Sequence, residues 1–263
     1  MKVVAIVQAR MGSTRLPRKV LADIHGRPML RWLLDRISSI GQIDEVVVAT
    51  TGKIEDDELA QWLQEENIAC FRGSEEDVLD RFYRCAEERQ AEIVVRVTAD
   101  DPLKDPGIIR QAIGVILDDP TIHYCSNSLK PTYPEGLDIE VFRHCALIRA
   151  FNEAQLPSER EHVTPYIWKN PDKFRLYSLE CDRDLSHWRW TVDKPVDLVF
   201  IRAIYDEFKD SPLVSCTDVI SYLDRNPHLI EINTASTVRN EGYLKSLLME
   251  KNEHDTEQQS LRQ

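Results

Sequence analysis

Apolar runs alternate with amphipathic segments through the first half of the chain. Nearly continuous apolar runs are typical of strands that are buried on both faces of a parallel sheet. They predict strands over residues 3–7, 45–50, 68–71 and 92–98. Apolar residues at helical spacing predict helices over residues 28–41, 55–66, 74–86 (with Ser74 as N-cap) and 108–117. This alternation indicates an α/β protein with three layers (α/β/α) and a mostly parallel central sheet.

The second half of the chain has a less regular pattern. Strands are expected over residues 122–126, 137–142, 174–179 and 188–192, with an antiparallel arrangement as one option for the last two. Helices are expected over residues 144–154, 159–169, 195–208, 217–224 and 238–249. Because there is no internal repeat, long linker or break in composition, we expect a single domain over residues 1–250. The polar, apolar-poor residues 251–263 predict a disordered tail.

Composition excludes several classes of protein. The 263 residues carry 45 acidic and 33 basic side chains, a net charge of -12, which argues against an extended nucleic-acid-binding surface. No apolar stretch approaches the roughly 18–20 residues of a membrane span, and the N-terminus lacks a signal-peptide pattern, so we expect a cytoplasmic protein. The six cysteines form no C-x-x-C pair, which argues against a cysteine metal cluster or a disulfide framework.

A basic loop over residues 8–19, QARMGSTRLPRK, follows the first predicted strand. Arg10, Arg15, Arg18 and Lys19 gather around Gly12, with no acidic residue before position 23. Arginine, lysine and free backbone N–H groups suit phosphate oxygens, and a glycine allows close approach of the backbone to an anion. The loop matches neither G-x-G-x-x-G nor the Walker pattern. It therefore predicts a different triphosphate site, with a solvated basic loop as the alternative.

Acidic residues follow two later predicted strands. Asp100 and Asp101 come at the end of the strand over 92–98, and Asp193 follows the one over 188–192. In an open parallel sheet the carboxyl ends of the strands share one edge, where ligands bind. Magnesium on a nucleotide takes one or two carboxylates together with phosphate oxygens, so Asp100 and Asp193 are candidate ligands. The alternatives are a simple turn for Asp101 and a helix cap for Asp193.

Three motifs, in the order in which they occur along the chain, resemble those of the cytidylyltransferases that activate acidic sugars, such as 3-deoxy-manno-octulosonate and acylneuraminates. The motifs are A-R-x-G-S-x-R-L-P-x-K, D-D-P and V-D-K-P-V-D-L. The resemblance is closest to the spore-coat polysaccharide biosynthesis SpsF group, which the segments 72–79, 136–142 and 160–166 also resemble. It extends from residue 3 to about residue 200. The implied fold is a Rossmann-like nucleotidyltransferase fold with an irregular second half.

The resemblance also implies roles for single residues. The nucleotide half, about residues 1–120, would hold the phosphates through Arg10, Gly12, Ser13, Arg15 and Lys19. Cytosine would be recognised in part by backbone near Ala9, Gly73 and Ser74. The magnesium ligands would be Asp100 and Asp193, and the residues expected to act in catalysis are Arg10, Arg15, Lys19 and Asp100.

Residues 121–200 would face the acceptor and a partner subunit, with helices following to residue 250. Acceptor-binding candidates are Asp138, Glu140, Arg160 and His162. A polar sheet face is the alternative for Asp138 and Glu140, and a packed histidine is the alternative for His162. The resemblance also implies a homodimer, with the second-half strands and the tryptophans Trp188 and Trp190 as its contact or, alternatively, as core.

The expected activity is CTP- and Mg²⁺-dependent transfer of CMP to a sugar acid or related glycan precursor, with release of pyrophosphate, for a surface polysaccharide. A glycosyltransferase that uses a nucleotide-sugar is one alternative, although a triphosphate explains the basic loop better. A non-catalytic nucleotide-binding protein of a polysaccharide assembly is another. A guanylyl- or uridylyltransferase is also open, because backbone contacts that select a base leave no mark in a sequence.

Overall fold

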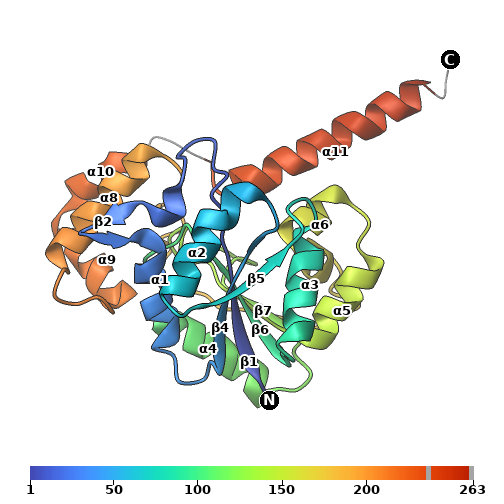
Figure 1. Ribbon diagram of the computed structural model, residues 1–263, viewed down its shortest axis with the longest axis horizontal. Coiled ribbons are helices and arrows are strands. Elements are labelled where there is room, and N and C mark those ends of the chain that lie inside the picture. The colour runs from blue at the N-terminus through green and yellow to red at the C-terminus, as the bar shows by residue number, and fades with distance from the viewer. Residues whose placement is uncertain (235–237, 261–263) are drawn as a thin grey trace.

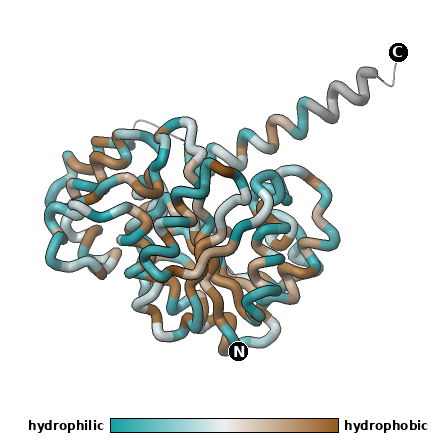
Figure 2. Tube along the Cα trace, in the orientation of Figure 1, coloured by the Kyte–Doolittle hydropathy of each residue, from teal (hydrophilic) through white to brown (hydrophobic). Residues whose placement is uncertain are grey.

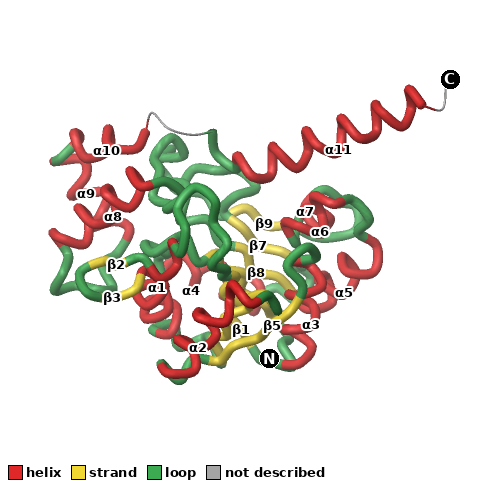
Figure 3. The backbone as a smooth tube through the Cα atoms, turned by 45° about the horizontal axis from the view of Figure 1, so that its top comes forward, coloured by secondary structure: helices red, strands yellow, loops and turns green. Residues whose placement is uncertain are grey.

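A mixed seven-stranded sheet forms the centre of the protein (Figures 1 and 3). The computed structural model describes the backbone of residues 1–234 and 238–260, and the side chains of residues 1–233 and 238–252. In spatial order the strands are β5 (Ala69–Gly73), β4 (Glu45–Thr51), β1 (Val3–Gln8), β6 (Ile93–Thr98), β8 (Glu140–Arg143), β7 (Tyr124–Ser126) and β9 (Leu176–Ser178). A separate hairpin pairs β2 (Asp23–Ile24) with β3 (Arg27–Pro28).

The pairing confirms a mostly parallel sheet. Strands β5, β4, β1 and β6 are parallel neighbours, as expected for strands that are connected through helices. Strand β8 is antiparallel to both β6 and β7, and β9 is parallel to β7. The regular first half of the sequence thus builds the parallel part of the sheet, and the less regular second half adds the mixed edge.

Helices cover both faces of the sheet, as the α/β/α prediction required. They are α1 (Met29–Ser38), α2 (Asp57–Glu65), α3 (Val78–Glu88), α4 (Pro106–Asp118), α5 (His144–Glu153), α6 (Pro157–His162), α7 (Pro165–Trp168), α8 (Pro195–Glu207), α9 (Cys216–Arg225), α10 (Pro227–Thr234) and α11 (Glu241–Ser260), with short 3-10 turns at Lys19–Leu21 and Ile54–Asp56.

Alternation along β1 divides the core in two. Val3, Ala5 and Val7 pack with apolar residues of α1, α2, α4, α8 and α9, whereas Val4 and Ile6 pack with those of α3, α5 and α7. Successive strand residues point to opposite faces, so an all-apolar strand needs a helical layer on each side. Figure 2 shows the resulting band of hydrophobic backbone through the centre of the molecule.

The strand predicted over residues 188–192 is wrong. The segment forms a single bridge, Glu135 to Arg189, and is otherwise irregular. Trp190 N donates to Glu135 O at 2.7 Å, but Gly136 has φ +105°, which turns the partner segment away after one pairing. Trp188 and Trp190 are both buried within the chain, so the alternative that they are core residues is correct and a dimer contact through them is not available.

Three helix predictions need correction. The helix expected over 159–169 is two helices, α6 and α7, because Val163 has φ +72° between them. Helix α10 was not expected at all. Ser74 does not cap α3. The N-cap of α3 is Asp77, whose carboxylate accepts a hydrogen bond from Asp80 N. Ser74 lies in the preceding turn, where its Oγ accepts from Asp77 N.

Helix α11 projects from the body of the protein (Figure 1). It begins at Glu241 and its backbone remains helical to Ser260, into the segment 251–263 that we expected to be disordered. The segment contains no proline or glycine, so nothing in it stops a helix once α11 has started. Residues 261–263 lie outside the described part of the chain. None of the described helices is both long enough and apolar enough to span a membrane.

Candidate active site

Lys19 joins the two carboxylates that the sequence proposed as a pair. Its Nζ donates to Asp100 Oδ2 and to Asp193 Oδ1, each at 2.9 Å, and to Val192 O at 3.1 Å. Burial alone would lower the pKa of Lys19, but the charges of the two aspartates outweigh it and raise that pKa. Burial would likewise raise the pKa of Asp100, yet Lys19 holds it below its usual value. At neutral pH the charged ammonium of Lys19 therefore lies against the charged carboxylate of Asp100.

The loop that delivers Lys19 is anchored by a buried carboxylate. Met11 N donates to Asp56 Oδ1 at 2.7 Å, and Asp56 also accepts from Thr51 at the end of β4. Past this anchor, Arg18 takes φ +59° and the short helix Lys19–Leu21 begins, with Val20 buried beneath it. Sequence reasoning missed Asp56, although its position in the first turn after β4 places it beside the basic loop.

A backbone hydrogen bond of the residue before Asp193 brings Asp193 close to Asp100. Val192 N donates to Asp100 O at 2.8 Å, which fixes the irregular segment against the end of β6. Asp193 does not cap α8, contrary to one alternative: its Oδ2 accepts from Arg189 Nη2 at 3.1 Å, and its other oxygen from Lys19 and Arg15. The N-cap of α8 is Lys194, and Asp197, the third residue of the helix, accepts through Oδ2 from the backbone N–H groups of Asp193 and Lys194.

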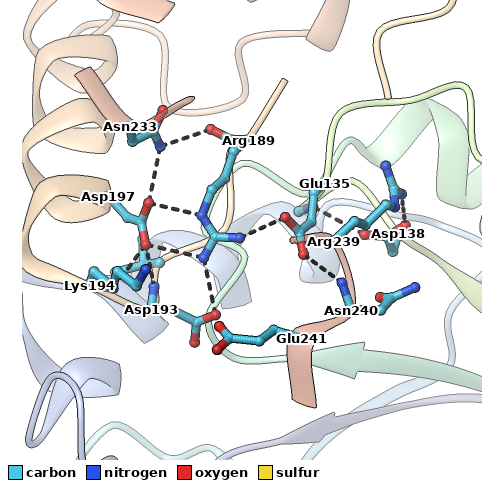
Figure 4. A network of polar contacts seen from close by, with 12 residues as sticks. Glu135, Asp138, Arg189, Asp193, Lys194, Asp197, Asn233, Arg239, Asn240 and Glu241 are labelled. Carbon is cyan, nitrogen blue, oxygen red and sulfur yellow. Dashed lines mark hydrogen bonds and ion pairs between the residues drawn. The ribbon is translucent and has the colours of Figure 1, made fainter. Parts of the chain in front are cut away.

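Arg189 lies at the centre of a buried ionic network (Figure 4). Its guanidinium donates to Asp197 at 3.0 Å, to Glu135 at 2.6 Å and to Asp193 at 3.1 Å. Asp197 is fully buried, and Asn233 of α10 donates to it at 3.1 Å. Burial would lower the pKa of Arg189, but its carboxylate partners outweigh it and raise that pKa. This network sets the position of Asp193.

Asp101 differs from its neighbour Asp100. It is buried and accepts from Thr98 Oγ1 at 2.6 Å, and it pairs with the buried Lys104 at 2.8 Å. Burial raises its pKa to about 6, although Lys104 acts in the opposite direction. Lys104 in turn donates to the backbone carbonyl of Asp138. Asp101 is thus more than a simple turn residue, because it ties the end of β6 to the segment that precedes β8.

A pocket of about 450 Å³ opens beside the Lys19 site. Charged side chains from five parts of the chain line it: Arg15, Arg96, Asp100, Asp101, Glu135, Asp138, Glu140, Arg189, Asp193 and Glu241. His162, Trp168 and Tyr243 provide an aromatic wall. Among the described residues, no cluster of three or more histidine, cysteine or acidic side chains has the geometry of a protein-only metal site. A metal here would depend on Asp100 and Asp193 together with oxygens of a ligand.

The remaining nucleotide-binding candidates lie in the loop after β1 and at the end of β5. Arg10 is exposed and contacts Glu75 at 3.3 Å, next to Ser74. Gly12 is exposed and has open space where a side chain would be. Ser13 Oγ accepts from Leu16 N at 3.3 Å, inside the loop.

The backbone near the expected cytosine site is partly engaged. Ala9 N donates to Ala49 O at 3.2 Å, so the N–H of Ala9 is not available to a base. Gly73 has no room for a side chain, because a Cβ there would lie 2.9 Å from Arg81. Arg81 is buried and donates to Ser74 O at 2.6 Å. The packing around Arg81 therefore requires a glycine at position 73.

Three of the four acceptor candidates line the pocket. Glu140 is buried, pairs with Arg96 and accepts from Tyr124 OH at 2.6 Å and from Thr164. Asp138 pairs with Arg239. Asp138 lies before β8, so it does not share a strand face with Glu140 as expected. His162 lies at the end of α6, with Nε2 3.0 Å from Ser246 Oγ.

Arg160 is outside the pocket lining. Its Nε donates to Asp77 Oδ2 at 3.0 Å and its Nη1 donates to Phe151 O at 2.8 Å. Asp77 is the N-cap of α3, so Arg160 links α6 to that helix end. The start of α11, in contrast, was not a candidate, yet Asn240 just before the helix and Glu241, Gly242 and Tyr243 in its first turn line the pocket. No sequence motif marks these residues.

Comparison with known proteins agrees with this geometry. The family described as Cytidylyltransferase matches residues 4–218. The chain belongs to the cytidylyltransferase family. It is 34% identical over 233 residues to the spore coat polysaccharide biosynthesis protein SpsF of Bacillus subtilis, covering 86% of this chain and 95% of that protein. A solved cytidylyltransferase from Leptospira borgpetersenii has a TM-score of 0.84 and 32% identity, covering 90% of this chain and 99% of that one.

Another relative, whose name includes a substrate, matches a shorter part of the chain. This cytidylyltransferase is 36% identical over 124 residues to the 3-deoxy-manno-octulosonate cytidylyltransferase of Geobacter sulfurreducens, covering 46% of this chain and 48% of that protein. Family membership confirms the Rossmann-like nucleotidyltransferase fold and CTP-dependent transfer of CMP. It favours nucleotidyl transfer over the glycosyltransferase alternative.

Proposed function

We propose that this cytidylyltransferase transfers CMP to a sugar acid or a related glycan precursor of a surface polysaccharide, using Mg²⁺. The observation that carries the proposal is the contact of Lys19 with Asp100 and Asp193 at the edge of a polar pocket of about 450 Å³. The names of the SpsF and 3-deoxy-manno-octulosonate relatives support the class of acceptor. An oxygen of the acceptor would attack the α-phosphorus of CTP, and pyrophosphate would leave.

Charge neutralisation is the main task of the side chains in such a reaction. Arg10, Arg15 and Lys19 would offset the negative charge that grows on the β- and γ-phosphates as pyrophosphate leaves. Arg10 and Arg15 are exposed at the site, so both can reach a ligand without a change in the core. Lys19 is held by two carboxylates until phosphate oxygens compete for it.

The residues present fit a magnesium ion. Mg²⁺ in nucleotide sites takes one or two carboxylates together with phosphate oxygens, which matches Asp100 and Asp193 in number and kind. The ammonium of Lys19 already lies between these carboxylates, so the pair attracts a cation. When bound, the ion would supply charge neutralisation and lower the pKa of an attacking hydroxyl. Asp100 and Asp193 would hold it, and Lys19 would then pair with phosphate.

The proposal includes a homodimer, which the resemblance implies, and a cytoplasmic location, which the sequence pattern predicts. Tyr177 on β9 is exposed on a strand at the edge of the sheet, which leaves a surface for a partner subunit. Trp188 and Trp190 take no part, because they are buried within the chain. Light scattering after size-exclusion chromatography tests this part: a mass of one chain at micromolar concentration would contradict it.

The reaction is tested by incubating the protein with Mg²⁺, each of CTP, UTP, GTP and ATP, and a panel of sugar acids and sugar phosphates. Pyrophosphate and the mass of the nucleotide product are recorded together. We expect acceptor-dependent pyrophosphate from CTP, which Asp100→Ala and Asp193→Ala each abolish. Asp172→Ala, a change of an exposed aspartate, is the matched control. Binding of CTP without pyrophosphate from any acceptor would instead favour the non-catalytic alternative.

A further inference from the structure

Helix α11 packs against α6 beside the pocket and positions the imidazole of His162. Ser246 Oγ of α11 lies 3.0 Å from His162 Nε2 and donates to Glu161 Oε2 at 2.7 Å. Gly242 O, one turn earlier in α11, is a second acceptor at 3.2 Å from the same hydroxyl. The three side chains therefore form a short chain of hydrogen bonds from Glu161 through Ser246 to His162.

The direction of these bonds fixes the tautomer of His162. A serine hydroxyl has one hydrogen, and the carboxylate of Glu161 and the carbonyl of Gly242 can only accept it. Ser246 Oγ must then act as acceptor toward the ring, so His162 Nε2 carries the hydrogen. Glu161 Oε2 is also only 3.6 Å from Nε2, which favours the same tautomer. Neutral imidazole has one N–H, and Nδ1 is left with a lone pair.

The ring of His162 faces the pocket and is held in place. It lines the pocket, and Tyr243 contacts its face edge-on with ring centroids 5.2 Å apart. The side chain is 24% exposed, so a ligand in the pocket can reach it. None of the described residues forms a hydrogen bond to Nδ1, whereas Nε2 is engaged. The free nitrogen is thus the one available to a ligand.

Three carboxylates and one guanidinium act on the charge of His162. Glu161 and Glu250 approach it from α6 and α11, Glu140 comes from β8, and Arg96 comes from β6. Burial lowers the pKa of His162 below its usual value, and the attraction of Glu161 only partly opposes it. The imidazole is therefore mostly neutral at pH 7 and can take up a proton.

We infer that His162 Nδ1 is the general base of the reaction, and that Ser246 and Glu161 are positioning residues that hold it in the required tautomer. This inference rests on the proposed function. As the acceptor oxygen bonds to the α-phosphorus, its O–H bond breaks and the proton passes to Nδ1. The bond from the α-phosphorus to the bridging oxygen breaks, and its electron pair leaves with pyrophosphate. The imidazolium then returns its proton to solvent.

The tautomer can be read without any acceptor. Long-range ¹H–¹⁵N correlation spectra of the full chain labelled with [¹⁵N]histidine distinguish a protonated from a bare ring nitrogen. We expect His162 with a protonated Nε2 in the wild type and in Ser246→Thr, which keeps the hydroxyl, and a mixture of tautomers in Ser246→Ala. Ser221→Ala is the control, since that helical serine also bonds the carbonyl four residues earlier. A His162 with a protonated Nδ1 in the wild type would overturn the inference.

Turnover provides the second readout, with the panel acceptor that gives the highest rate. His162→Asn should lower kcat about 100-fold or more and leave the Kd for CTP unchanged. The pH profile of kcat for His162→Asn should lose its acidic limb. Ser246→Ala should lower kcat by a smaller factor than His162→Asn does, and Ser246→Thr should keep the wild-type kcat. A His162→Asn rate equal to that of the wild type would contradict the inference. If no acceptor gives pyrophosphate, that result counts against the proposed function. The tautomer of His162 is measured without an acceptor, so it tests the inference separately.

Discussion

Arg15 Nη1 lies 2.9 Å from Glu241 Oε2, a contact that joins the basic loop after β1 to the first turn of α11. The other terminal nitrogen of Arg15 lies 3.1 Å from Asp193 Oδ1. Two carboxylates thus hold this guanidinium in the free protein, and a triphosphate would have to compete with both. Residues more than 200 positions apart in the chain share one side of the pocket for this reason.

Glu241→Gln should strengthen CTP binding. The variant removes one anionic competitor for Arg15, and a partly exposed ion pair contributes about 0.5 kcal/mol, so we expect the Kd to fall about twofold. Isothermal titration with CTP measures the change. Lys245→Gln, which removes the other partner of Glu241, is the control and should leave the Kd unchanged or slightly higher. A weaker affinity in Glu241→Gln would show that Glu241 assists the nucleotide.

Lys19→Met should allow a divalent cation to bind before the nucleotide. In the free protein the ammonium occupies the space between Asp100 and Asp193, so its removal takes away the cation that the two carboxylates share. We expect the affinity of the free protein for Mn²⁺ to rise about tenfold, which corresponds to about 1.4 kcal/mol. Electron paramagnetic resonance of free Mn²⁺ gives the affinity. Lys130→Met, at an exposed lysine, should have no effect.

Glu140→Gln should destabilise the protein by about 3 kcal/mol at pH 7, because Arg96, whose side chain is only 14% exposed, would lose its carboxylate partner. Burial favours the neutral carboxyl, but Arg96 and the bonds from Thr164 and Tyr124 hold the pKa of Glu140 below its ordinary value. Its contribution is therefore fully present above the unfolded pKa of about 4.3 and is lost as the pH falls through the lower folded pKa.

Urea unfolding at pH 7 and at pH 3 tests this prediction. The difference in the free energy of unfolding between the wild type and Glu140→Gln should be smaller at pH 3. Glu180→Gln, at a partly exposed pair with Lys130, should change it by less than about 1 kcal/mol. An equal loss from Glu140→Gln at both pH values would exclude the ionised carboxylate as the source of stability.

Gly136→Ala should be among the most damaging small substitutions in the chain. Gly136 has φ +105°, and an added Cβ would lie 2.6 Å from Thr191 N and from the carbonyl carbon of Trp190. We expect a loss of about 3 kcal/mol or more, measured by thermal and urea unfolding. Gly114→Ala in α4 has open space around the new methyl group and should stabilise the protein by about 0.5–1 kcal/mol. A mild effect of Gly136→Ala would show that the segment can shift.

The donor side of the site could be predicted because it depends on regular structure. Lys19 and Asp100 follow parallel strands, and the ends of such strands share one edge whatever the details of packing. The prediction for Asp193 applied the same rule to a strand over residues 188–192, and the structure shows that this segment is not a strand. Asp193 lies beside Lys19 and Asp100 because Val192 N donates to Asp100 O, a single backbone bond that no periodicity reveals.

The acceptor side depends on tertiary contacts and was harder to predict. Arg160 and His162 lie two residues apart in α6, yet one bonds the cap of α3 and the other lines the pocket. Which face of a short helix meets which neighbour is decided by the helices packed around it, and the sequence carries no local signal for that choice. Tyr243 and Glu241 were missed for the same reason, since α11 has no motif of its own.

The position of α11 also bears on biosynthesis of the chain. Lys19, Asp100 and Asp193 are all synthesised before the first turn of α11, which supplies Glu241 and Tyr243 to the pocket. A nascent chain that has folded its central sheet therefore still has an open pocket, and His162 has not yet met Ser246. Translation that stops shortly before residue 241 would yield a chain that lacks one wall of the pocket.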